Sequence, residues 1–126
     1  TVYVPEERVA ILGDTLFVDC QTWLHSADIA ALLKSLDFVE TLDVDYLIPG
    51  HGPVVTKDYV KKQRAWVYEW LGAVGEGISK GWSVDECVAN ISFADRCPMD
   101  IGQPETMEYV QRTKTVKCYN YLTNQL

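Results

Sequence analysis

The segment Pro49-Gly50-His51-Gly52-Pro53 constrains the fold more than any other part of this chain. Two prolines and two glycines within five residues are incompatible with a helix interior or a central strand. We therefore expect a strand at residues 45–48 that ends at Ile48, followed by a stiff loop that presents His51. A neutral imidazole binds zinc, iron or manganese and can also act as a general base, so we interpret His51 as a functional residue.

A second candidate follows the apolar residues 9–12, which are typical of a buried strand. Gly13 and Asp14 come directly after this run, where Asp14 is either a turn residue or a carboxylate projected into a cleft. Taken alone, the turn is the more common of the two. The two candidates reinforce each other, because two strands of one sheet then end in an oxygen ligand and a nitrogen ligand. A carboxylate can bridge two cations, so this combination favours a dinuclear hydrolytic site.

The remaining pattern predicts a mixed α+β chain. Residues 1–4 and 9–12 are expected to form a hairpin, and residues 93–102 a loop. Apolar residues at helical spacing predict three helices: Ala27 to about Glu40, capped by Ser26; a long helix capped by Thr56; and a short helix with a capping box from Ser83 to Glu86. Pro104 suits a first helical turn and predicts a last helix from Glu105 to about Thr123, whose periodicity is poorer. We expect one unit over residues 1–126, with strands and ligand motifs in residues 1–55 and mainly helices in residues 56–126.

Composition narrows the functional class. The net charge of −7 argues against nucleic acid as a partner, and the basic cluster Lys61, Lys62 and Arg64 fits the solvated face of a helix. The sequence contains neither a membrane-spanning apolar run nor a visible signal peptide. Its four cysteines form no C-x-x-C pair, which favours reduced thiols and a cytoplasmic setting. The chain opens at Thr1 in a strand-like run, so we expect a piece of a longer protein.

Residues 9–17, followed by Leu47-Ile48-Pro49-Gly50-His51-Gly52, resemble the C-terminal half of a metallo-β-lactamase-fold hydrolase. The resemblance covers roughly residues 1–53 and weakens from Thr56 onward. It implies an αββα sandwich of two similar halves, of which this chain would be the C-terminal half with an added helical region. It also implies that Asp14 bridges two metal ions and that His51 binds the second.

The family's H-x-H-x-D-H motif, which supplies most ligands, does not occur in this chain. The resemblance therefore implies a parent protein with two divalent metal ions, zinc above all, with iron or manganese as alternatives. In that parent, metal-bound water would attack an ester, thioester, lactone, amide or phosphodiester of a small-molecule substrate. The chain itself would carry the metal ligands Asp14 and His51, no catalytic residue, and would need the missing N-terminal half for activity.

The alternative is a non-catalytic module that dimerises or binds a partner through its uncovered sheet. Among other residues, His25 and Cys20 are weaker candidates for a ligand role, and Trp23 and Trp82 for the wall of a groove. A structural interpretation is favoured for Tyr59, Trp66 and Trp70 as packing residues, Glu86 as the capping-box partner, and Asp19 and Asp95 as solvated carboxylates.

Overall fold

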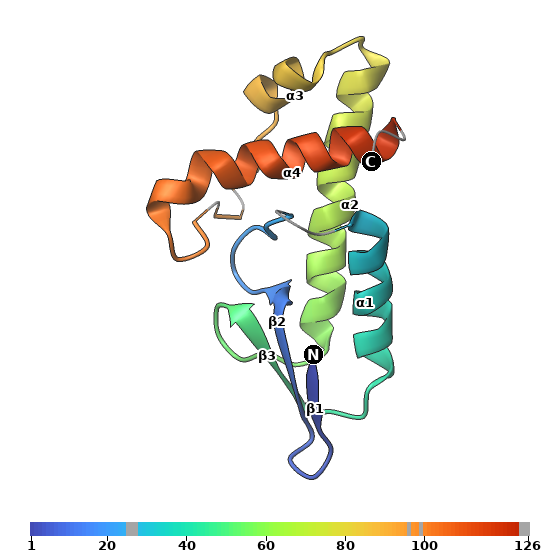
Figure 1. Ribbon diagram of the computed structural model, residues 1–126, viewed down its shortest axis with the longest axis vertical. Coiled ribbons are helices and arrows are strands. Elements are labelled where there is room, and N and C mark those ends of the chain that lie inside the picture. The colour runs from blue at the N-terminus through green and yellow to red at the C-terminus, as the bar shows by residue number, and fades with distance from the viewer. Residues whose placement is uncertain (25–27, 96, 99, 124–126) are drawn as a thin grey trace.

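The computed structural model describes residues 1–24, 28–95, 97–98 and 100–123, and it confirms a mixed α+β chain (Figure 1). The elements follow one another in this order: β1 Val2–Val4, β2 Val9–Phe17, α1 Ile29–Thr41, β3 Tyr46–His51, α2 Asp58–Ser79, α3 Val84–Asn90, a 3₁₀ turn Pro104–Thr106 and α4 Met107–Leu122. None of the helices in these described ranges combines the length and apolar character needed to cross a bilayer.

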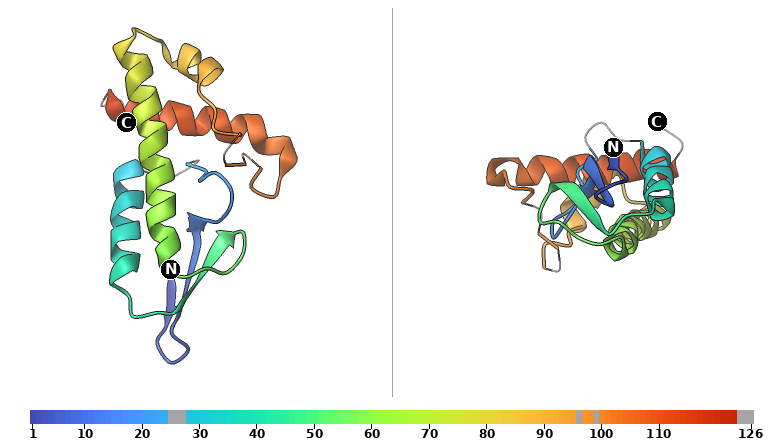
Figure 2. Two further views of the ribbon diagram at one scale, coloured as in Figure 1. Left: turned by 180° about the vertical axis from the view of Figure 1, so that it is seen from behind. Right: turned by 90° about the horizontal axis from the view of Figure 1, so that it is seen from below.

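The three described strands form one sheet in the order β1-β2-β3. Strand β1 is antiparallel to β2, as the predicted hairpin requires, whereas β3 is parallel to β2. Parallel neighbours need a long crossover connection, and α1 provides it. Figure 2 shows α1 and α2 side by side along the sheet, with α4 crossing α2 beyond the sheet's end.

The two strands that carry Asp14 and His51 continue past their predicted ends, so those two boundaries were wrong. Strand β2 runs through Gly13 and Asp14 to Phe17, because Gly13 takes a left-handed conformation (φ 55°) and a bulge absorbs the irregular pairing. Strand β3 includes Pro49, which pairs with Gly13. Proline is tolerated there because β3 is an edge strand of the described sheet, so one side of its backbone needs no partner.

Two predicted helix caps also differ from the structure. Ser26 lies outside the described residues, and α1 is capped by Asp28, whose carboxylate accepts a hydrogen bond from the Ala31 backbone N–H at 2.9 Å. Thr56 does not cap α2: the cap position is Lys57, and it makes no side-chain bond there. The capping box of Ser83 and Glu86 is confirmed, with both reciprocal hydrogen bonds present.

One face of the sheet is packed and the other is open. Ala10, Leu12 and Leu47 are at most 3% exposed and face the helices. The alternate positions, which point the other way, are all apolar, and we call them the open sheet face: Val2, Val4, Val9, Ile11, Tyr46 and Ile48. Val2, Ile11 and Tyr46 are 57%, 40% and 53% exposed, and Val4, Val9 and Ile48 are half-buried, so the described part of the chain leaves this face partly uncovered.

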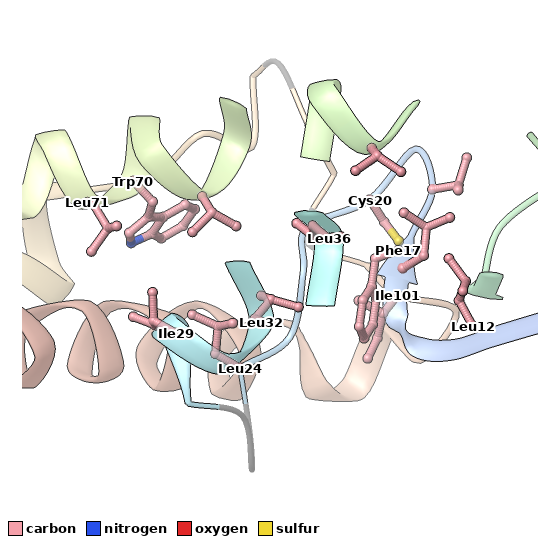
Figure 3. Packing of buried hydrophobic residues seen from close by; sticks show 14 of the residues in the cluster. Leu12, Phe17, Cys20, Leu24, Ile29, Leu32, Leu36, Trp70, Leu71 and Ile101 are labelled. Atoms are coloured by element: carbon pink, nitrogen blue, oxygen red, sulfur yellow. The ribbon is translucent and has the colours of Figure 1, made fainter. Parts of the chain in front are cut away.

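The core is one contiguous cluster that joins the packed sheet face to the helices (Figure 3). In the close-up, Phe17, Leu12 and Ile101 lie at the sheet end, and Trp70 and Leu71 lie at the α2–α4 end. All four cysteines are buried and free, which confirms the expectation of unpaired, packed thiols. The basic cluster is a solvated helix face, because Lys61 and Lys62 are exposed and Arg64 pairs with Asp37 and Glu40.

Candidate metal centre

A bulge in β2 presents Asp14. The register pairs Gly13 with Pro49 and then Phe17 with His51, so residues 14–16 of β2 lie opposite the single residue Gly50 of β3. A strand with surplus residues must buckle away from its partner, which turns the side chain within the bulge out of the regular alternation. The Asp14 side chain is consequently 73% exposed, between the Gly13–Pro49 and Phe17–His51 pairs.

Glycine is required on both sides of His51. A Cβ atom on Gly50 would collide with Asp14 Oδ1 and lie 2.6 Å from the Gly13 carbonyl carbon. A Cβ on Gly52 would collide with the Val18 carbonyl oxygen and lie 2.8 Å from Val18 Cβ, and Gly52 also has a φ of 94°. The two glycines therefore let β3 approach β2 closely enough to set the imidazole beside the carboxylate.

The two ring nitrogens of His51 have different partners. Nδ1 lies 2.6 Å from the Ile101 carbonyl oxygen, which can only accept, so Nδ1 carries the proton and donates it. Nε2 then presents a lone pair in the neutral ring, and it faces Asp14 Oδ1 at 3.4 Å. This is the tautomer of a metal ligand whose other nitrogen is held by a backbone carbonyl.

The Nε2–Oδ1 separation decides between two explanations of the contact. At 3.4 Å it exceeds the 2.7–2.9 Å typical of a charge-assisted hydrogen bond between an imidazolium and a carboxylate. Zinc bonds of about 2.1 Å at a tetrahedral angle would hold their two donors about 3.4 Å apart. A lone pair and an anionic oxygen at this spacing therefore fit a shared cation better than a direct hydrogen bond.

A supporting layer holds the two ligands in place. The Phe17 ring, 1% exposed, stacks on the imidazole with ring centroids 4.6 Å apart and planes 5° from parallel. The Val18 backbone N–H donates to the His51 carbonyl at 2.9 Å, which fixes the end of β3 on β2. Gln63 of α2 hydrogen-bonds the bulge on either side: its Oε1 accepts from the Phe17 N–H and its Nε2 donates to the Thr15 carbonyl, both at 2.7 Å.

The structure brings together the two predicted ligands and separates them from the weaker candidates. No group of three or more potential metal ligands occurs among the described residues, so Cys20 does not complete a set with Asp14 and His51. Burial raises the pKa of the Cys20 thiol to about 11, which keeps it protonated near neutral pH. His25 lies outside the described residues.

The aromatic candidates lie in different surroundings. Trp70 is fully buried, as expected of a packing residue. Trp23 packs edge-on against Tyr109, and Trp82 lies beyond the end of α2, at the opposite end of the molecule from the sheet (Figure 1). Trp82 therefore does not line a groove beside Asp14 and His51. Tyr59 and Trp66 border a cavity of about 240 Å³ together with Asp19, Lys62, Cys97 and Pro98.

Sequence reasoning missed three supporting residues, of which one carried a signal. Gln63 interrupts the apolar stripe of α2 between Val60 and Val67, and a polar residue at a core position of a helix is the mark of a specific buried hydrogen bond. The stacking of Phe17 on His51 depends on strand register, and the role of Ile101 depends on the path of a loop. Neither of these can be read from local pattern.

The strand-bearing part of the chain is similar to a known protein family. Residues 1–51 match the family model of the metallo-beta-lactamase superfamily. The matched region contains β1, β2, α1 and β3, and with them Asp14 and His51. Residues 52–126 lie outside the match. A search of curated proteins found no match for the chain.

Proposed function

We propose that this chain is the C-terminal part of a dinuclear metal-dependent hydrolase, in which Asp14 and His51 bind metal. The family match over residues 1–51 supports a metallo-beta-lactamase-superfamily origin. The observation that carries the proposal is the His51 Nε2 lone pair facing Asp14 Oδ1 at a spacing suited to a shared cation. Zinc suits this pair of donors, and iron and manganese are the alternatives.

Each residue of the site has a distinct task. The Ile101 carbonyl holds the His51 tautomer and makes the ring a better donor. Asp14, exposed on its bulge, has a second carboxylate oxygen free to reach a second cation. Divalent metal ions, when bound, activate water near neutral pH and polarise the scissile bond of an ester, thioester, lactone, amide or phosphodiester.

Two donors do not fill a tetrahedral shell, so the remaining ligands must come from outside the described residues. We infer that a complementary half of the sandwich supplies them and packs on the open sheet face. Sheets that pack face to face bury such apolar alternation. The isolated chain should therefore bind metal weakly and hydrolyse no generic lactone or thioester faster than buffer.

The open sheet face also supports the second candidate function, a module that associates with a twin or another protein. A contiguous face of six apolar side chains favours association in either case. The two functions differ at Asp14 and His51, because a pure association module has no use for a metal-ligand tautomer. A cytoplasmic setting is part of the proposal, and four free, buried thiols support it.

Calorimetric titration with Zn²⁺ tests the metal assignment. We expect weak binding by the wild-type chain, lost in Asp14→Asn and His51→Ala. Two variants are matched controls. Asp19→Asn removes an exposed carboxylate just after the end of β2, and His25→Ala removes the other histidine. Equal Zn²⁺ binding by Asp14→Asn and the wild type would overturn the assignment.

A further inference from the structure

The bulge that carries Asp14 leaves backbone groups without strand partners. Between the Gly13–Pro49 pair and the Phe17–His51 pair, β3 offers only Gly50 against residues 14–16 of β2. Buried backbone N–H and C=O groups are rarely left unpaired, because they lose their hydrogen bonds to water without a replacement. A bulge of this kind persists only where another group replaces the missing strand.

Gln63 is that replacement. Like a peptide group, its carboxamide offers both an N–H donor and a carbonyl acceptor, and it uses one of each on β2. Oε1 accepts from the Phe17 N–H, and Nε2 donates to the Thr15 carbonyl, each at 2.7 Å. The side chain is 1% exposed, so water does not compete for these bonds.

The hydrogen bond from Phe17 to Gln63 also affects His51, through the Phe17 ring. Phe17 stacks on the imidazole nearly face to face and is its register partner across β2 and β3. The plane of the Phe17 ring therefore limits the plane of the imidazole, which must stay turned so that Nδ1 reaches the Ile101 carbonyl. One side chain of α2 thus acts on the oxygen ligand through the bulge and on the nitrogen ligand through the stacked ring.

We propose that Gln63 is a positioning residue of the metal centre, which holds the β2 bulge and the Phe17 ring so that Asp14 and His51 converge. The metal part of this inference rests on the proposed function, whereas the positioning of the His51 ring can be measured without metal. Gln63 touches neither ligand, so its effect on the site is indirect.

The test compares Gln63→Met with the wild type by NMR of the His51 ring in metal-free protein. A stacked aromatic ring shields the protons that face it, so we expect the His51 ring-proton signals to move downfield in Gln63→Met. The preference for the Nδ1–H tautomer should also weaken. Gln63→Asn, which is polar but too short to span both backbone groups, provides a milder second variant with the same expected direction.

Val74→Ala is the matched control, because it destabilises the core from the same helix without a hydrogen bond to β2. It should leave the His51 ring signals unchanged. Unchanged signals in both Gln63 variants, or equal changes in Val74→Ala, would overturn the positioning role.

Zn²⁺ titration of the same proteins separates this inference from the proposed function. Loss of a hydrogen bond made directly to a metal ligand weakens metal affinity about tenfold or more. Gln63 acts one residue further away, so a severalfold loss of affinity is expected. We expect that loss in Gln63→Met and not in Val74→Ala. If the wild type binds Zn²⁺ and Gln63→Met binds it equally well, the positioning inference fails alone. If wild-type His51 does not respond to Zn²⁺, the proposed function fails, and the metal-free signals still decide the role of Gln63.

Discussion

Replacing Lys114 with methionine should stabilise this protein near neutral pH. Lys114 lies in α4 and is completely buried. Its ammonium donates to Gln21 Oε1 at 2.7 Å and lies 5.0 Å from the centre of the Trp70 ring. No ion pair of Lys114 with a carboxylate is seen in the described residues. Burial accordingly lowers the pKa of Lys114 from 10.5 to about 8.

The magnitude follows from the two pKa values. Below pH 8 the folded protein keeps Lys114 charged, although its pKa falls from 10.5 to about 8. Burying this charge therefore lowers the free energy of unfolding by roughly 3 kcal/mol. Lys114→Met removes this cost, but it leaves the buried Gln21 Oε1 without its donor, which costs about 1–3 kcal/mol. The net expectation at pH 7 is about 1 kcal/mol of added stability, or a urea midpoint about 0.5 M higher.

The pH dependence identifies the cause. Between pH 8 and 10.5 the unfolded chain binds the Lys114 proton and the folded chain does not, so wild-type stability gains from this group as pH rises. Burial raises the pKa of Cys20 and of Cys118, and these thiols act in the opposite direction at high pH. Both proteins contain them, so the difference between Lys114→Met and the wild type isolates the lysine. That difference should fall by about 3 kcal/mol between pH 7 and pH 10.5, where the wild type becomes the more stable protein.

Urea unfolding at pH 7 and pH 10.5 measures both quantities. Lys117→Met, a half-buried lysine of the same helix, is the matched control and should show little change at either pH. A Lys114→Met protein that is less stable than the wild type at pH 7, or a stability difference that stays constant with pH, would refute the reasoning.

Two further predictions concern the site and the sheet. Gly50→Ala should abolish the Zn²⁺ response and cost about 1–3 kcal/mol in urea unfolding, because its Cβ would collide with Asp14 Oδ1. The control Gly72→Ala, where a Cβ meets nothing within 4 Å, should leave the Zn²⁺ response unchanged and raise the free energy of unfolding by at most about 1 kcal/mol. A normal Zn²⁺ response in Gly50→Ala would contradict the predicted collision. Light scattering should show that the wild type associates. Ile11→Glu, on the open sheet face, should reduce this association, whereas Phe38→Glu, at an exposed site of α1, should not. A strictly monomeric wild type would count against that surface.

The sequence predicted the elements better than their ends. Apolar spacing located α1 and α2, the Ser83–Glu86 pattern located α3, and Pro104 indicated the start of α4, because each signal is local. The predicted ends of β2 and β3 are wrong because glycine and proline interrupt most strands but not these two. In the fold, Gly13 forms a bulge and Pro49 lies on an edge strand, and both facts depend on which strands are neighbours.

The candidate site shows the same division. Asp14 and His51 were identified from residue type and from their places after apolar runs, and the structure places them 3.4 Å apart. The groups that fix their geometry come from distant parts of the chain: Gln63 from α2 and Ile101 from the loop before α4. Polar residues on apolar stripes, such as Gln63 and Lys114, were the available signals for buried hydrogen bonds.

The most direct test of the metal centre is long-range ¹H–¹⁵N NMR of the His51 ring during a Zn²⁺ titration. The account predicts that Nδ1 carries the proton before metal is added and that Zn²⁺ shifts the Nε2 signal. It also predicts that Asp14→Asn weakens this shift while Asp19→Asn does not. A ring protonated on Nε2 in the neutral state, or a Zn²⁺ response that is independent of Asp14, would contradict it.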